Sequence, residues 1–231
     1  MPNRANVHIF LFFKMIVSTA STTQSAALVA EFSGGAQSSV DIMLGIGLQK
    51  DSEAVFFQYK GDDTVEALVQ ASGKPVTRIA PVRLTGITIA DGIYKDAGFD
   101  GSKVNIFLET QSGRTVMLTS GLTTIWTQCI MTSLMGLVRN DSLDHLIAID
   151  TWKGTSKMRP CFAAVRDGSV KVTDDEMYRA LTDARSDRDR AKTEALVRDA
   201  VEIIGAQLNG IPATVTDVTD YTETEDQEVA F

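Results

Sequence analysis

The chain has 231 residues, 44% of them hydrophobic and 23% charged, and a formal net charge of -8 at pH 7. A chain of this composition can bury a sizeable core in one large domain, with or without appendages. With two histidines and two cysteines in all, and no cysteine pair at ligand spacing, the sequence argues against a zinc site.

The charge is distributed unevenly along the chain. Between Lys50 and Lys171 there are fourteen Lys and Arg residues against thirteen Asp and Glu, so the central region is close to neutral. From Gly205 to the end there are six acidic residues and no basic one. The negative net charge of the whole chain therefore does not exclude an anionic partner for residues 50–171.

The N-terminal segment combines Arg4 with an apolar run over residues 8–17 that Lys14 interrupts. This run is too short to span a bilayer. A secretory signal is one interpretation, and a true start at Met15 is the other. We favour the second, because nothing downstream resembles a disulfide-stabilised secreted domain, and we expect a cytoplasmic protein with Cys129 and Cys161 as free thiols. Residues 1–40 are expected to form a flexible arm.

The region from 41 to 172 is rich in predicted strands. Apolar runs near Ile42 and over residues 55–59 come first, and Asp63–Ala71 is predicted to be a short helix that stops at Gly73. Residues 78–90 are rich in β-branched side chains, and residues 103–109 and 114–119 form a hairpin around Gln111-Ser-Gly113. A helix over 123–138 follows, with Trp126 in the core, and then two strands over 144–152 and 158–166.

The C-terminal part is predicted to be helical and then disordered. Thr173-Asp-Asp-Glu176 has the pattern of a capping box, so helical structure should begin there and run to about residue 209, with a break in the charged middle as one possibility. Residues 210–231 carry acidic side chains and end in Val-Ala-Phe231. Such a segment is expected to be disordered, and a terminal aromatic beside a free carboxylate suits capture by a partner protein. A solubilising tail is the alternative.

The order strand, strand, strand, helix, strand, strand over residues 76–168 is that of an OB-fold barrel. Together with the acidic tail that ends in Phe231, it resembles the single-stranded DNA-binding proteins of bacteria and their phages. The resemblance implies a β-rich α+β protein with a five-stranded OB-like barrel and a helix between strands 3 and 4. It also implies a homo-oligomer that binds single-stranded DNA and recruits replication or repair proteins through Glu225, Asp226, Glu228 and Phe231. Whirly-type and transcriptional coactivator-like folds fit the same element order.

Single-strand binding requires exposed aromatic side chains beside positive charge. The best local cluster is Trp152 with Lys153, Lys157 and Arg159, on a loop that contains Gly154. The further candidates are Phe107, Arg114, Tyr94 and Lys95. Phe107 should face outward, because the apolar Val104, Ile106 and Leu108 occupy the inward face of the same strand. Phe57 and Phe162 are expected to cover a core or a contact between subunits.

An enzyme is poorly supported by the sequence. It contains no phosphate-binding P-loop, no nucleophile elbow and no histidine-based metal motif. We therefore expect no catalytic residue, cofactor or metal, and no membrane partner. The alternative function is a β-barrel adaptor that mediates protein interactions or oligomerisation without nucleic acid.

Overall fold

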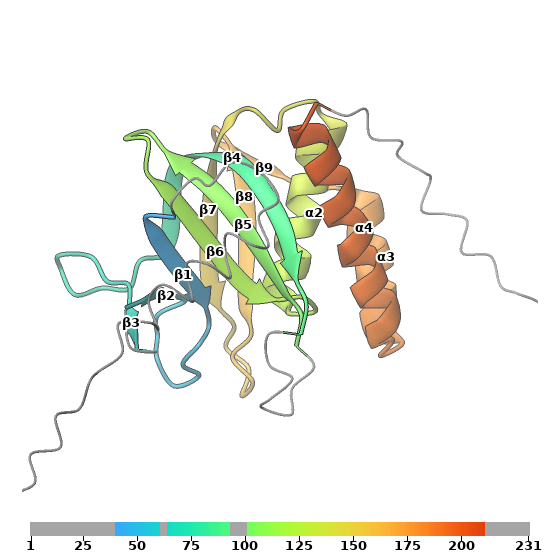
Figure 1. The fold of residues 1–231 in the computed structure, drawn as a ribbon. Helices are drawn as coiled ribbons and strands as arrows, with labels where there is room; N and C mark the ends of the chain where they lie inside the picture. Colours follow the sequence, from blue (N-terminus) through green and yellow to red (C-terminus); the bar gives the residue numbers. More distant parts are fainter. Residues whose placement is uncertain (1–39, 61–63, 93–100, 211–231) are drawn as a thin grey trace, which may run out of the picture.

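The computed structural model describes residues 40–60, 64–92 and 101–210. Residues 1–39 of the arm expected over 1–40 lie outside the described residues. So do the candidates Tyr94 and Lys95, and Glu225, Asp226, Glu228 and Phe231 of the acidic tail. The described part is an α+β structure in which one sheet is covered on one side by helices (Figure 1).

The sheet has nine strands in the order β3-β2-β1-β6-β5-β4-β7-β8-β9. Neighbouring strands are antiparallel, except that β1 runs parallel to β6. The strands are β1 (Ile42–Ile46), β2 (Phe56–Tyr59), β3 (Val65–Ala67), β4 (Arg78–Ala90), β5 (Lys103–Thr110), β6 (Thr115–Gly121), β7 (Leu146–Lys153), β8 (Cys161–Asp167) and β9 (Val170–Val172). The sheet is open, with β3 and β9 at its edges, so the prediction of a closed five-stranded OB-like barrel is wrong.

Two other sequence predictions are corrected by the sheet. Of the helix predicted over residues 63–71, the described residues 64–71 are not helical, because β3 pairs with β2 through Phe57–Ala67 and Tyr59–Val65. The helical propensity of this short segment is outweighed by the hydrogen bonds and side-chain contacts it gains at the sheet edge. The edge strand β9 was not predicted, since three residues carry almost no periodic signal.

Strand β4 joins the two halves of the sheet. Its first residues pair with β7 and its later residues pair with β5, with register shifts at Ile79/Val82 and at Leu84/Gly86. Bulges of this kind bend a strand and increase its local twist. The bent strand carries the sheet around the helices, as Figure 1 shows.

Helix α2 (Ile125–Arg139) lies between the sheet and the two C-terminal helices. It follows the β5–β6 hairpin as predicted, and Trp126 is buried in the core at 1% exposure. Twelve of its fifteen residues are buried, on every side of the helix. Such a helix is stable only inside a core.

The predicted C-terminal helical segment is two helices, α3 (Asp175–Ser186) and α4 (Arg190–Leu208). The first cap is Asp174 rather than Thr173, because the Asp174 carboxylate accepts a hydrogen bond of 2.7 Å from the Met177 amide. Asp174 is almost completely buried and also forms an ion pair with Arg139 in the last turn of α2. The side chain that starts α3 therefore also attaches it to α2.

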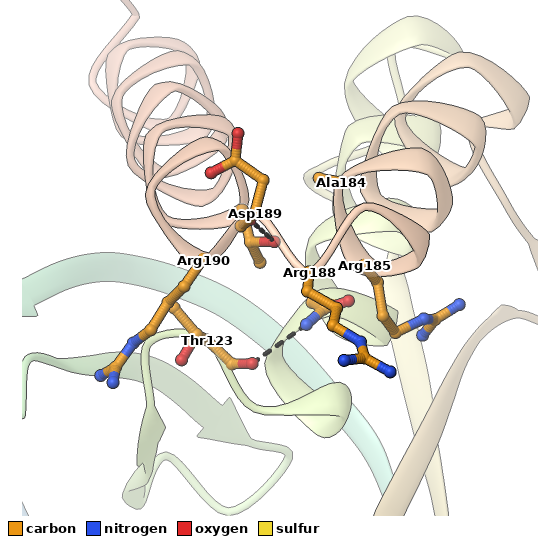
Figure 2. Close-up of a pocket in the computed structure, with 8 residues that line it drawn as sticks. Thr123, Ala184, Arg185, Arg188, Asp189 and Arg190 are labelled. Carbon is orange, nitrogen blue, oxygen red and sulfur yellow. Dashed lines mark hydrogen bonds between the residues drawn. The ribbon is translucent and has the colours of Figure 1, made fainter.

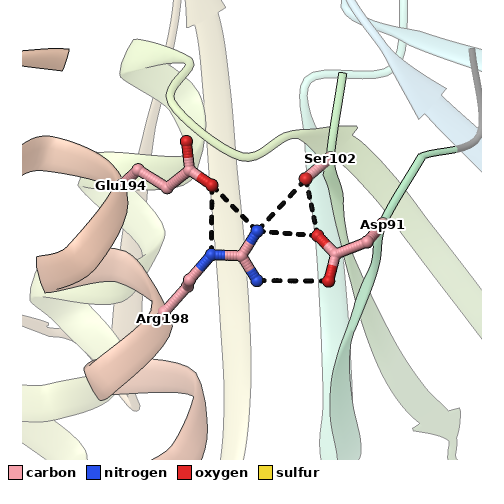
Figure 3. A network of polar contacts seen from close by, with 4 residues as sticks. All are labelled: Asp91, Ser102, Glu194 and Arg198. Carbon is pink, nitrogen blue, oxygen red and sulfur yellow. Dashed lines mark hydrogen bonds and ion pairs between the residues drawn. The ribbon is translucent and has the colours of Figure 1, made fainter. Parts of the chain in front are cut away.

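Helix α4 is attached to the sheet by Arg198 (Figure 3). The Arg198 guanidinium contacts Asp91 at 2.6 Å, Glu194 at 2.8 Å and Ser102 at 3.2 Å. Asp91 follows β4 and Ser102 precedes β5, so one guanidinium connects the helix with the ends of two paired strands. Its hydrogen bonds with Asp91 and then with Glu194 raise the pKa of Arg198 further above its usual range.

Two helical glycines allow a matched test of the packing around α2. A Cβ on Gly136 would lie 2.8 Å from Val172 Cγ1 and 3.0 Å from the backbone carbon of Thr173, whereas a Cβ on Gly205 would meet only Ile87 Cγ2 at 3.9 Å. Gly136→Ala should destabilise the protein by about 1–3 kcal/mol, because backbone would have to move. Gly205→Ala should stabilise it by up to about 1 kcal/mol through helix propensity.

Urea unfolding followed by circular dichroism would measure both changes in the free energy of unfolding. A Gly136→Ala protein as stable as the parent would contradict the close contact between α2 and the start of α3.

Candidate nucleic-acid interface

The loop that carries the predicted cluster connects β7 to β8 at one end of the sheet (Figure 1). Trp152 is 44% exposed, and its ring stacks on that of Phe162 with 5.9 Å between the centroids and 15° between the planes. The two residues are cross-strand partners in the β7–β8 ladder. Phe162, expected to cover a core or a subunit contact, is half-buried, and we call its stacked pair with Trp152 the aromatic platform.

The platform lies on the face of the sheet that points away from the helices. In β7, the side chains of Ile147, Ile149 and Thr151 are buried toward the helices. Because side chains alternate between the two faces of a strand, Trp152 points to the opposite face. We call this side of β4, β7, β8 and β9 the outer face. The hydrogen-bonded pairing of β7 with β8 holds the two rings side by side on this face.

Basic side chains accompany the platform on the outer face. Arg78 and Arg166 both contact the Asp150 carboxylate, at 3.1 Å and 2.6 Å. Lys171 pairs with Arg166 in the β8–β9 ladder and is exposed. Two arginines thus share one carboxylate, and Lys171 lies beside Arg166, so this part of the outer face has more basic than acidic side chains.

The basic residues of the predicted loop cluster have different roles. The Lys153 ammonium donates to the backbone carbonyls of Gln49, at 2.9 Å, and of Ser52. Arg159 forms an ion pair of 2.6 Å with Glu53. Both therefore hold residues 47–55, the β1–β2 loop, against the β7–β8 loop. Lys157 is exposed, and no hydrogen bond or ion pair is found for it among residues 40–60, 64–92 and 101–210.

The same junction encloses Cys161. Gly47 has a φ of +63°, and a Cβ there would lie 2.8 Å from Cys161 Sγ, so glycine is required both by the backbone and by the contact. Burial raises the pKa of the Cys161 thiol, and the charge of Lys153 opposes this only in part. Both cysteines are free thiols, as expected from the sequence.

Phe107 and Arg114 are not brought to the platform. Phe107 does face away from Val104, Ile106 and Leu108, and is half-buried beside Gly86 of β4. Phe107 pairs with Gly86 of β4, whereas Asp150 of β7 pairs with Arg78 of the same strand. These two positions of β4 are on the order of 25 Å apart along an extended chain. Arg114 is exposed at the β5–β6 turn, at the other end of the sheet from the β7–β8 loop in Figure 1.

Sequence reasoning missed Arg78, Arg166 and Lys171 as members of this surface. They come from three strands, and only strand pairing places them beside one another. Phe57, expected to be buried, is fully so at 0% exposure.

Comparison with protein-family models found no match, and comparisons with curated proteins and with solved structures found none either. The described residues contain no helix long and apolar enough to cross a membrane. Within the same ranges, no group of three or more His, Cys, Asp or Glu side chains could hold a metal ion.

The two lysines of the loop should respond differently to substitution. Lys153→Met should lower the free energy of unfolding by about 1–3 kcal/mol, because carbonyls of the β1–β2 loop lose a charged donor. Lys157→Met removes the same charge from an exposed position and should change stability by less than about 0.5 kcal/mol.

Chemical denaturation of both variants would measure the difference. Equal stabilities for the two variants would show that Lys153 does not hold the loops together.

Proposed function

We propose that this protein binds single-stranded DNA, without sequence preference, on the outer face around Trp152 and Phe162. The observation that carries the proposal is the stacking of the exposed Trp152 ring on Phe162 in a paired β-ladder, with Arg78, Arg166 and Lys171 on the same face. A role in replication, recombination or repair follows from such an activity.

The chemistry of the outer face suits an unpaired strand. A base can stack on the open side of the Trp152 ring, because every base offers a flat π surface whatever its sequence. Arg78, Arg166 and Lys171 supply cations for the phosphates. A duplex buries its base faces within the stack, so the platform favours unpaired strands.

The Asp150 carboxylate limits the electrostatic contribution. It already pairs with Arg78 and Arg166, so a phosphate that approaches either arginine competes with it. The affinity should therefore depend strongly on the aromatic platform and only moderately on salt.

The composition of the C-terminal segment supports a second part of the proposal. Phe231 with Glu225, Asp226 and Glu228 would recruit replication or repair proteins, and the DNA-binding unit would be a homo-oligomer. A basic, partly apolar groove on the partner is the complementary surface.

Replacement of Trp152 provides the direct test of DNA binding. Trp152→Ala should weaken binding to a labelled poly-dT oligonucleotide by about 5- to 150-fold, the equivalent of one lost stacking contact of 1–3 kcal/mol. Fluorescence anisotropy would measure the dissociation constants. Leu146→Ala is the matched control, because Leu146 is an exposed apolar residue of the same strand and face at 45% exposure.

Leu146→Ala should bind as the parent does. No binding by the parent protein, together with capture of a protein partner on the outer face, would replace the proposal by the adaptor function. Equal affinities for the parent and Trp152→Ala would show that the aromatic platform does not bind DNA.

Removal of the tail tests the recruitment proposal separately. A chain that ends at Thr216 should bind poly-dT at least as tightly as the full chain, because the deleted residues carry only negative charge. It should fail to retain replication or repair proteins that the full chain retains on an affinity column. Retention by both chains would contradict a role for Phe231.

A further inference from the structure

The tip of the β7–β8 loop presents an apolar side chain beside an unpaired cation. Met158 is 74% exposed, the highest value among the large hydrophobic side chains of residues 40–60, 64–92 and 101–210. Lys157 precedes it, is exposed, and has no ion pair or hydrogen bond within these ranges. The segment from Trp152 to Pro160 contains three basic residues and no acidic one. The tip is therefore both apolar and positively charged.

A tight turn fixes the shape of this tip. The Arg159 amide donates to the Ser156 carbonyl at 2.8 Å, which closes a turn with Lys157 and Met158 as its two central residues. Arg159 itself has a φ of +46°, a left-handed conformation that is uncommon for a residue other than glycine. Such backbone strain persists only where the surrounding structure enforces it, and it is concentrated at functional sites. Figure 1 shows the loop extending beyond the end of the sheet.

The tip is joined to the aromatic platform by close packing. The Gly154 amide donates to the Pro160 carbonyl at 2.8 Å, at the base of the loop. A Cβ on Gly154 would lie 2.9 Å from Phe162 Cε2 and 3.3 Å from Pro160 Cδ, so the base of the loop lies directly against the ring of Phe162. Phe162 in turn stacks on Trp152. The platform and the tip therefore form one continuous surface.

A DNA strand bound on the platform reaches the tip within a few nucleotides. Gly154 is two residues beyond Trp152, and the turn lies farther out, so Met158 is on the order of 10 Å from Trp152 along the direction of the strand. A stacked DNA strand advances by about 3.4 Å per nucleotide, so about three nucleotides cover this distance. The continuity of the two surfaces favours one shared ligand over a membrane or a second protein at the tip.

The chemistry of the tip suits the end of a duplex. Where a duplex opens into a single strand, its last base pair exposes one flat, apolar face to water. An apolar side chain that covers this face removes both surfaces from water. Apolar side chains of DNA-binding proteins, methionine among them, pack at base steps in this way. The flexible thioether of Met158 can adapt to any base pair, and the Lys157 ammonium is a cation for the neighbouring phosphates.

We propose that the tip of the β7–β8 loop binds the end of a duplex at the point where it continues into the single strand held on the outer face. Met158 covers the terminal base pair, and Lys157 contacts its phosphates. The preferred ligand is then a junction between single-stranded and duplex DNA rather than an unpaired strand alone. This inference rests on the proposed function, since it extends the DNA site around Trp152.

Fluorescence anisotropy with three labelled ligands would test the proposal: a poly-dT strand, the same strand extended by a duplex stem, and the blunt duplex of that stem. The full chain should bind the tailed duplex about five- to tenfold more tightly than the strand, the gain expected from partial burial of one methionine side chain. The blunt duplex should bind most weakly. Met158→Ala should abolish the preference for the tailed duplex and leave the affinity for poly-dT unchanged.

Three further variants separate the contact from a general effect of substitution. Met158→Leu should retain the preference, because leucine offers a similar apolar area. Val170→Ala is the matched control, since Val170 is 66% exposed in β9, beside the β8–β9 turn at the other end of β8, and it should bind all three ligands as the parent does. Lys157→Gln should reduce the salt dependence of binding to the tailed duplex by about one phosphate contact. Met158→Ala should unfold in urea as the parent does, because its side chain is exposed.

The outcomes distinguish this proposal from the proposed function. Equal affinities for the strand and the tailed duplex, or an unchanged preference in Met158→Ala, would overturn the role of the tip, while Trp152-dependent binding of poly-dT would still support the proposed function. Absence of binding to both the strand and the tailed duplex would overturn both. Met158-dependent sedimentation with vesicles of phosphatidylserine and phosphatidylcholine, without a preference for the tailed duplex, would overturn the proposal and assign the tip to a membrane surface.

Discussion

The burial of α2 is the constraint on which the rest of the structure depends. The helix has one charged residue, Arg139 at its C-terminal end, and its apolar and small polar side chains are buried all round. Water must therefore be excluded on every side, which neither a flat sheet nor a pair of helices alone can achieve. The bulged β4 curves the sheet around one side, and α3 and α4 cover the other.

The polar contacts at the ends of α2 follow from the same constraint. At the C-terminal end, Arg139 reaches Asp174 and Glu176, so the charge of the helix is used to fix α3. At the N-terminal end, Thr124 caps the helix and no carboxylate of the first turn compensates it. Arg185, Arg188 and Arg190 line a surface pocket near this end, together with Asp189 (Figure 2).

The basic residues of the β7–β8 loop and those of the outer face differ in how their charges are used. Lys153 and Arg159 neutralise carbonyls and a carboxylate of the neighbouring loop, which leaves them less available to an anionic ligand. Arg78, Arg166 and Lys171 lie on paired strands and share a single carboxylate. Positive charge on the outer face is thus decided by pairing partners rather than by the density of basic residues along the chain.

The sequence by itself determined the local elements whose signals are strong and continuous. The β5–β6 hairpin and α2 with its buried Trp126 follow from alternation or helical spacing within one segment, and the exposure of Trp152 follows from its basic neighbours beside Gly154. Periodicity reports which face of an element is apolar, and it needs no knowledge of the other elements.

Only the tertiary structure decided how the strands are arranged and which residues lie together on the outer face. The element order of residues 76–168 is compatible with a barrel, but β1 adds in parallel beside β6 and extends the sheet through β2 and β3, so it stays open. Which strands pair depends on hydrogen bonds between segments that lie far apart in the chain, and a local pattern does not record them. The stacking of Phe162 on Trp152 has the same origin, because the two residues become neighbours only when β7 and β8 pair.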